Sequence, residues 1–115
     1  MVLDNYIKQD FVKQVFMESC LFISDIWQAE TLAKSYLGHR LNIIFESSYI
    51  KYAFFNKLKL YHPNIKVVSC DASKLRFIKD LEDYNKELII FDRVNYLIDI
   101  SIFNMINKMN RILVC

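Results

Sequence analysis

Short apolar runs alternate with segments of helical periodicity through most of this chain of 115 residues. The runs occupy residues 41–45 (LNIIF), 65–70 (IKVVSC), 87–91 (ELIIF) and 111–115 (RILVC). They are largely continuous rather than alternating, which is typical of strands covered on both faces, as in parallel sheets. Right-handed crossovers through helices would connect such strands. The pattern predicts an α/β fold, a three-layer α/β/α sandwich around a mostly parallel sheet of four or five strands.

The segments between the runs carry apolar residues at intervals of three and four, which predicts helices. The predicted helices cover residues 6–17, 27–37, 48–61, 72–84 and 96–109. Asp4 or Asn5 would cap the first helix and Asp71 the fourth. Gly38 would end the second helix and Pro63 the third.

The length of the chain fits one domain, residues 1–115, with an N-terminal helical part (1–40) and an alternating strand–helix core (41–115). The sequence contains a single glycine and a single proline. This scarcity excludes glycine-rich phosphate loops and long, turn-rich β architectures. Hydrophobic residues make up 54% of the chain, which excludes a disordered tail.

The N-terminal stretch MVLDNYIKQDFVKQ lacks the apolar core of a signal peptide, and no apolar run reaches the ~20 residues of a membrane span. Three cysteines without a CxxC spacing argue against a zinc site and a disulfide scaffold. We therefore expect a cytoplasmic protein that does not enter a membrane. The bias toward Lys, Ile, Asn, Tyr and Phe is typical of an AT-rich genome, such as that of a low-GC bacterium, a phage or another mobile element.

A further short apolar run lies at residues 21–23 (LFI). Acidic residues follow this run and the first three runs named above, and they are Asp25, Glu46, Asp71 and Asp92. Ligands of open α/β sheets bind beyond the carboxyl ends of the strands. Four carboxylates at that edge could bind a divalent cation. The alternative is that they cap the helices that follow and favour the helix dipoles.

The segment ELIIFD followed by RVNYLIDISIFNMINKMNRILVC resembles the second half of a P-loop NTPase core of the AAA+ type. In this resemblance Asp92 matches the Walker B aspartate, LNIIF is the first core strand and ESSYIKY occupies the phosphate-loop position. However, no glycine lies between Phe45 and Lys51, no GK[ST] motif exists, and Arg93 replaces the usual catalytic glutamate. The resemblance therefore implies a degenerate core that neither binds nor hydrolyses nucleotide.

Other catalytic patterns are also missing. His39 and His62 stand at predicted helix ends, which favours loop or cap roles. Cys70 stands at a strand end before a predicted helix, where a thiol pKa can be lowered, but no candidate base is near it in sequence. We expect that the protein is not an enzyme and that it uses no cofactor. The alternative is that it is a small enzyme that uses the strand-end acids or Cys70.

Basic residues gather between residues 51 and 79, where Asp71 is the only acid. They are Lys51, Lys57, Lys59, Lys66, Lys74, Arg76 and Lys79. Such a section could contact nucleic acid, but the lysines are spread over two predicted helices and a strand. A solvated surface is the alternative.

The predicted helix at 96–109 is apolar on two opposite sides, although a helix that covers a sheet needs one apolar face. One stripe consists of Ile98, Ile102, Met105 and Met109, and the other of Tyr96, Phe103 and Ile106. The first stripe is predicted to be a contact surface for a partner protein or a second copy. The alternative is that the N-terminal helix covers the extra face. The run 111–115 is predicted at a sheet edge, open to another chain, whereas the P-loop resemblance places it inside the sheet.

These features together predict a non-enzymatic protein-binding module, an inhibitor or adaptor of a larger protein machine. Nucleic-acid binding through the basic section is the alternative function.

Overall fold

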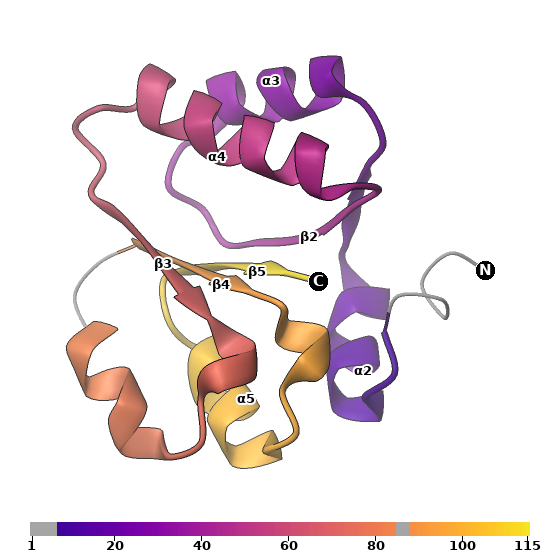
Figure 1. Cartoon of the computed structure of the whole chain (residues 1–115), viewed down its shortest axis with the longest axis vertical. Coiled ribbons are helices and arrows are strands. Elements are labelled where there is room, and N and C mark those ends of the chain that lie inside the picture. The colour runs from indigo at the N-terminus through magenta and orange to yellow at the C-terminus, as the bar shows by residue number, and fades with distance from the viewer. Residues whose placement is uncertain (1–6, 85–87) are drawn as a thin grey trace.

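The computed structural model describes residues 7–84 and 88–115. Within them, five parallel strands form one sheet in the order β1-β2-β5-β4-β3. The strands are β1 (Leu21–Ile23), β2 (Leu41–Phe45), β3 (Val67–Asp71), β4 (Leu88–Asp92) and β5 (Arg111–Val114). Helices cover both faces of this sheet, so the predicted α/β sandwich is confirmed (Figure 1).

The two helical layers contain different parts of the chain (Figure 1). One layer holds α3 (Ile26–Ser35) and α4 (Ser48–Tyr61). The other holds α2 (Asp10–Glu18), α5 (Ile100–Asn107) and the 3₁₀ segments η1 (Ala72–Lys74), η2 (Ile78–Tyr84) and η3 (Val94–Tyr96). Successive strand residues point to opposite layers: Ile43 and Ile112 pack under α3 and α4, whereas Ile44 and Leu113 pack against α2 and α5.

The order of the strands makes the sheet doubly wound. The chain passes from β1 to β2, crosses to β3 at the far edge, and returns through β4 to β5. The helices after β1 and β2 lie on one face, and the segments after β3 and β4 lie on the other. The segments that follow β2 and β4, the strands on either side of β5, leave toward opposite faces of the sheet, and a crevice between such segments is the usual ligand position in these sheets.

The local predictions agree best for the middle of the chain, where β2 and α4 have the predicted bounds. Residues 21–23, a short apolar run within the predicted helical part, form the edge strand β1, which is the fifth strand that the prediction of four or five allowed. The predicted caps Asp4 and Asn5 lie outside the described residues.

The predicted helix at 72–84 is instead two 3₁₀ segments, η1 and η2. The Asp80 side chain accepts hydrogen bonds from the backbone N–H groups of Arg76 and Phe77, at 3.0 and 2.9 Å. A side chain that bonds to its own backbone competes with continuous helix formation.

The predicted helix at 96–109 begins later than its apolar pattern indicates. Asp99 caps α5, because its carboxylate accepts hydrogen bonds from the N–H groups of Ser101 and Ile102. Ile98 therefore precedes the helix and is 72% exposed, whereas Ile102 is 0% exposed.

The predicted contact stripe is consequently not one surface. Met105 is exposed and Met109 is half-buried against the core, so Ile98, Ile102, Met105 and Met109 do not share one exposed face. The second stripe is partly covered by α2, as the alternative predicted, since the Phe11 and Phe103 rings lie 5.3 Å apart.

The C-terminal strand lies inside the sheet. β5 pairs with β2 on one side and with β4 on the other, and its residues from Arg111 to Val114 are all buried. The prediction that this strand forms an open edge is wrong. No helix within residues 7–84 and 88–115 is long and apolar enough to cross a membrane.

The corrected position of Ile102 gives a direct test. We expect Ile102→Asp to destabilise the protein by at least about 4 kcal/mol, because it buries an unpaired carboxylate in the core. Ile98→Asp is the matched control and should change stability by no more than about 0.5 kcal/mol, since this side chain is exposed. Urea unfolding followed by circular dichroism measures both; equal effects would contradict the assignment.

Candidate functional site

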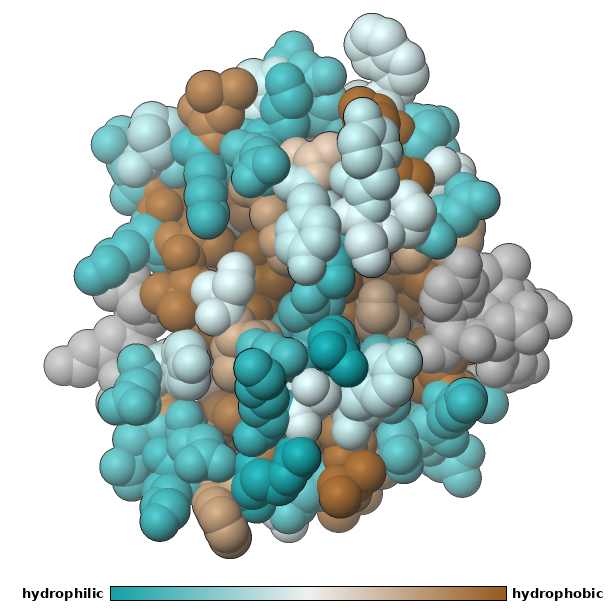
Figure 2. Space-filling model, in the orientation of Figure 1, coloured by the Kyte–Doolittle hydropathy of each residue, from teal (hydrophilic) through white to brown (hydrophobic). Residues whose placement is uncertain are grey.

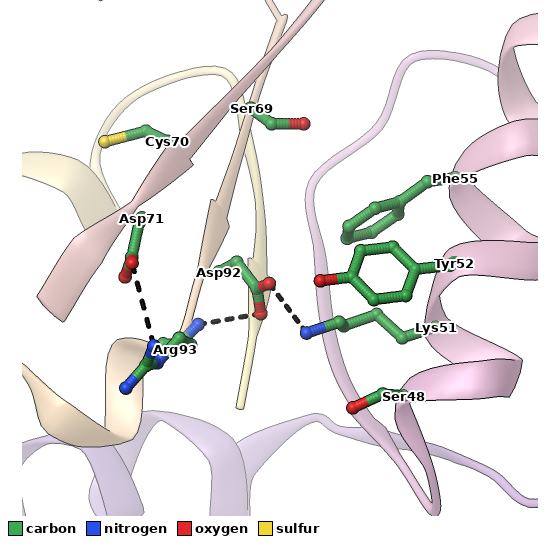
Figure 3. A pocket seen from close by; sticks show the side chains of 9 residues that line it. All are labelled: Ser48, Lys51, Tyr52, Phe55, Ser69, Cys70, Asp71, Asp92 and Arg93. Atoms are coloured by element: carbon green, nitrogen blue, oxygen red, sulfur yellow. Dashed lines mark hydrogen bonds and ion pairs between the residues drawn. The ribbon is translucent and has the colours of Figure 1, made fainter.

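A cavity of about 560 Å³ opens at the carboxyl edge of the sheet, between α4 and the ends of β3 and β4. This volume lies in the range of ligand pockets, and the position is where the winding of the sheet places a crevice. Figure 3 shows side chains from three elements around it. They are Ser48, Lys51, Tyr52 and Phe55 of α4, Ser69, Cys70 and Asp71 of β3, and Asp92 and Arg93 at the end of β4.

Lys51 and Asp92 form an ion pair at the base of the cavity. The Ser47 hydroxyl caps α4 by accepting a hydrogen bond from the Ile50 N–H at 3.3 Å, which places Lys51 in the first turn. Its Nζ lies 2.8 Å from Asp92 Oδ2, and the two side chains are 13% and 16% exposed. The ion pair therefore joins the first turn of α4 to the end of β4 in a largely desolvated position.

Arg93, at the mouth of the cavity, has a left-handed backbone. Its φ is 59° and ψ is 37°, the only positive φ of a non-glycine residue among the described residues. Asp92 Oδ1 accepts the Arg93 N–H at 2.8 Å and supports this conformation. Residues held in sparsely populated conformations concentrate at functional sites.

The Arg93 guanidinium extends along the rim of the cavity. It stacks 4.9 Å from the centre of the Tyr96 ring, and its Nη1 lies 3.8 Å from Asp71 Oδ2. The latter separation exceeds hydrogen-bond length, and the Arg93 side chain is half exposed. Its N–H donors therefore face solvent beside the opening.

Asp71 is held in its ionised form. Its Oδ1 accepts hydrogen bonds from the Ser73 hydroxyl at 2.6 Å and the Ser73 N–H at 3.0 Å, which caps η1. These hydrogen bonds, with a smaller contribution from the Arg93 charge, lower the pKa of Asp71.

Tyr52 and Phe55 form an aromatic wall on the α4 side (Figure 3). Their rings lie 6.0 Å apart in an edge-on arrangement, and Lys51 Nζ lies 4.8 Å from the centre of the Tyr52 ring. Tyr52 is exposed, so it presents an aromatic face both to the cavity and to a molecule that approaches it.

Cys70 is a poor nucleophile in this setting. Burial raises the pKa of its thiol, and a hydrogen bond with Tyr84 offsets only part of that increase. A protonated thiol is weakly reactive. The two histidines do not line the cavity: His62 Nε2 lies 2.6 Å from the Ala33 carbonyl, and His39 Nδ1 accepts the Leu37 N–H.

The four strand-end acids do not form one cluster. Asp25 caps α3 by accepting the Gln28 N–H, and Asp71 caps η1, which is the alternative predicted for them. Asp92 pairs with Lys51, and Glu46 is exposed beyond β2. Within residues 7–84 and 88–115, no three His, Cys, Asp or Glu side chains are placed to hold a metal ion.

The predicted nucleic-acid surface is divided between the two sides of the sheet. Lys57 and Lys59 are on α4, whereas Lys74, Arg76 and Lys79 belong to the opposite layer with η1 and η2. Lys66 precedes β3, and Lys51 is paired with Asp92 inside the cavity. These residues therefore do not form a single basic face.

Sequence reasoning placed Asp71 and Asp92 at one edge of the sheet, and the P-loop resemblance included Lys51 in the segment ESSYIKY, but neither predicted the ion pair of Lys51 with Asp92. Arg93 was named only as the replacement of a catalytic glutamate, and Tyr52 was given no role of its own. The sequence did contain a signal for the ion pair. It places a lysine in the first turn of the helix after one strand and an acid at the end of a later parallel strand. Comparison of the chain with protein-family models, curated proteins and solved structures found no match.

The ion pair at the base of the cavity can be tested for its contribution to stability. We expect Lys51→Met to cost about 2–3 kcal/mol, because Asp92 would remain largely buried without its partner. Adding Asp92→Asn should cost less than the sum of the single changes. Lys59→Met, on the exposed side of the same helix, is the control. Urea unfolding measures all four variants, and additive effects would contradict a coupled pair.

The state of Cys70 can be tested by alkylation. At neutral pH, iodoacetamide should modify Cys70 in the folded protein about tenfold or more slowly than in the urea-unfolded chain, because the buried thiol stays protonated. Mass spectrometry of digested samples follows this residue separately. Faster modification in the folded state would instead indicate an activated nucleophile.

Proposed function

We propose that this protein is a non-enzymatic protein-binding module whose partner docks over the cavity at the carboxyl edge of the sheet. The proposal rests on the composition of this edge. The aromatic wall of Tyr52 and Phe55 and the rim of Arg93 and Tyr96 surround the cavity, and the charged residues of the cavity pair with one another. Tyrosine and arginine dominate the binding energy of many protein interfaces.

The internal contacts of the cavity favour binding over catalysis. A nucleophile needs a base within hydrogen-bond reach, but the Cys70 thiol has a raised pKa and its hydrogen-bond partner is Tyr84. Lys51 and Asp92 neutralise each other. Such a pair fixes the floor of the cavity and leaves the aromatic side chains to make contacts.

The surface around the cavity matches a protein partner. In Figure 2, hydrophilic residues occupy the centre of this face, and hydrophobic surface flanks them along β3. Tyr52, which lines the cavity, and Tyr96, which stacks on Arg93, are both exposed. A partner that inserts an apolar side chain against Tyr52 and offers a carboxylate to Arg93 would satisfy both features.

A nucleotide is a poorer occupant of this edge. The segment between Phe45 and Lys51 contains no glycine, so its backbone cannot wrap a phosphate chain. Lys51 is also held by Asp92 at 2.8 Å. In our proposal the module acts as an inhibitor or adaptor of a larger protein machine.

Site-specific photo-crosslinking tests this proposal and identifies the partner. A photoreactive phenylalanine analogue in place of Tyr52 should crosslink one protein from the native host. The same analogue in place of Trp27, which is 78% exposed on α3, is the control and should not crosslink that protein.

Once the partner is identified, Tyr52→Ala and Arg93→Ala should each weaken its binding about tenfold or more, and Trp27→Ala should not. Isothermal titration calorimetry gives the dissociation constants. Equal crosslinking at both positions, or unchanged affinity in the two rim variants, would overturn the proposal. A crosslink between two copies of the chain, with a dimer in light scattering, would make self-association the answer instead.

A further inference from the structure

A second charged feature lies at the opposite, amino-terminal edge of the sheet. Arg111 is the first residue of β5 and is only 3% exposed, the one buried charged side chain among the described residues. Arg40 directly precedes β2 and is exposed. The parallel register pairs Leu41 with Ile112, so the two arginines stand side by side at the starts of neighbouring strands.

Both guanidinium groups bond only to neutral oxygens in the described part of the chain. Arg111 Nη1 donates to the Leu41 carbonyl at 2.8 Å and to Asn42 Oδ1 at 2.6 Å. Arg111 Nη2 donates to Asn107 Oδ1, and Arg40 Nη2 donates to the Asn107 carbonyl. The two cations therefore converge on Asn107, the last residue of α5.

No carboxylate balances these two charges within residues 7–84 and 88–115. Arg111 Nε is buried and has no hydrogen-bond acceptor among the residues that the structure describes. Burial, and then the neighbouring charge of Arg40, lower the pKa of Arg111 to about 10, which leaves the Arg111 guanidinium charged at neutral pH. Buried charges in proteins are normally paired.

The C-terminal end of α5 compensates for only part of this charge. A helix dipole supplies roughly half of a negative elementary charge at that end, against two positive charges. The Arg40 guanidinium has a single hydrogen-bond acceptor among the described residues, so most of its N–H donors point to solvent or to an incoming ligand.

We propose that Arg40 contacts and binds a compact oxyanion, either the free phosphate ion or a phosphomonoester group, and that the neighbouring buried charge of Arg111 adds to the attraction. The guanidinium fork matches the geometry of phosphate oxygens, and exposed Arg40 gives the ligand access. The bound anion supplies the negative charge that the described residues lack. The site lies at the other end of the strands from the cavity and does not depend on the proposed function.

Unfolding in the presence of inorganic phosphate tests the site, at fixed pH and with sodium chloride to keep the ionic strength constant. The unfolding midpoint of the wild-type protein should rise and then saturate as phosphate increases, because the ligand binds the folded state. Phosphate also stabilises proteins by exclusion from their surface, but that effect does not saturate and does not require Arg40.

Arg40→Gln is the decisive variant, since the side chain is exposed and its loss leaves the core intact. It should abolish the saturating part of the rise. Arg76→Gln is the matched control, because Arg76 is also exposed and also donates to backbone carbonyls. A rise that persists in Arg40→Gln, or a wild-type response no larger than that to chloride, would overturn the site.

Calorimetric titration with inorganic phosphate and with phenyl phosphate distinguishes the two sources of the anion. Tighter binding of the ester would assign the site to an organic phosphate, and tighter or equal binding of inorganic phosphate would assign it to the free ion. Heat of binding from neither compound, in a protein that circular dichroism shows to be folded, would reject the proposal.

Discussion

The C-terminal strand β5 joins the two halves of the sheet. β1 and β2 form one half, β3 and β4 form the other, and β5 pairs with both β2 and β4. Backbone groups buried between two helical layers must be hydrogen-bonded, so without β5 the inner edges of both halves would be left without partners. The burial of β5 from Arg111 to Val114 follows from this position.

The same winding explains why polar chemistry concentrates at the two ends of the strands. The middle of the inner strands β2, β4 and β5 faces apolar helices on both sides, which leaves no place for an unpaired charge. At the carboxyl end, Lys51 and Asp92 meet as an ion pair beneath an aromatic wall. At the amino end, Arg40 and Arg111 meet, and no carboxylate of the described residues pairs with them. Within the described part of the chain, one end of the strands is internally neutralised and the other is not.

This contrast separates the two proposals physically. A neutralised cavity with tyrosines and an arginine at its rim suits a protein partner, whose binding energy comes mainly from buried aromatic contacts. A pair of cations that bond only to neutral oxygens suits a small anion, whose charge completes the site. The two sites share β5 and its neighbours as a common support but use different residues.

The sequence by itself determined the strands β2 to β5, the helix at 48–61 and the α/β class, because continuous apolar runs are typical of strands covered on both faces. It also placed acidic residues at the ends of strands, because these residues come directly after the apolar runs in the sequence. It failed where short-range signals compete: Asp80 breaks one predicted helix, and the Asp99 cap sends Ile102 into the core while Ile98 stays outside. Only the tertiary structure decided the order of the strands, the internal place of β5, and the meetings of Lys51 with Asp92 and of Arg40 with Arg111. Those contacts join residues far apart in the chain, and a single sequence carries no direct record of which distant segments become neighbours when the sheet forms.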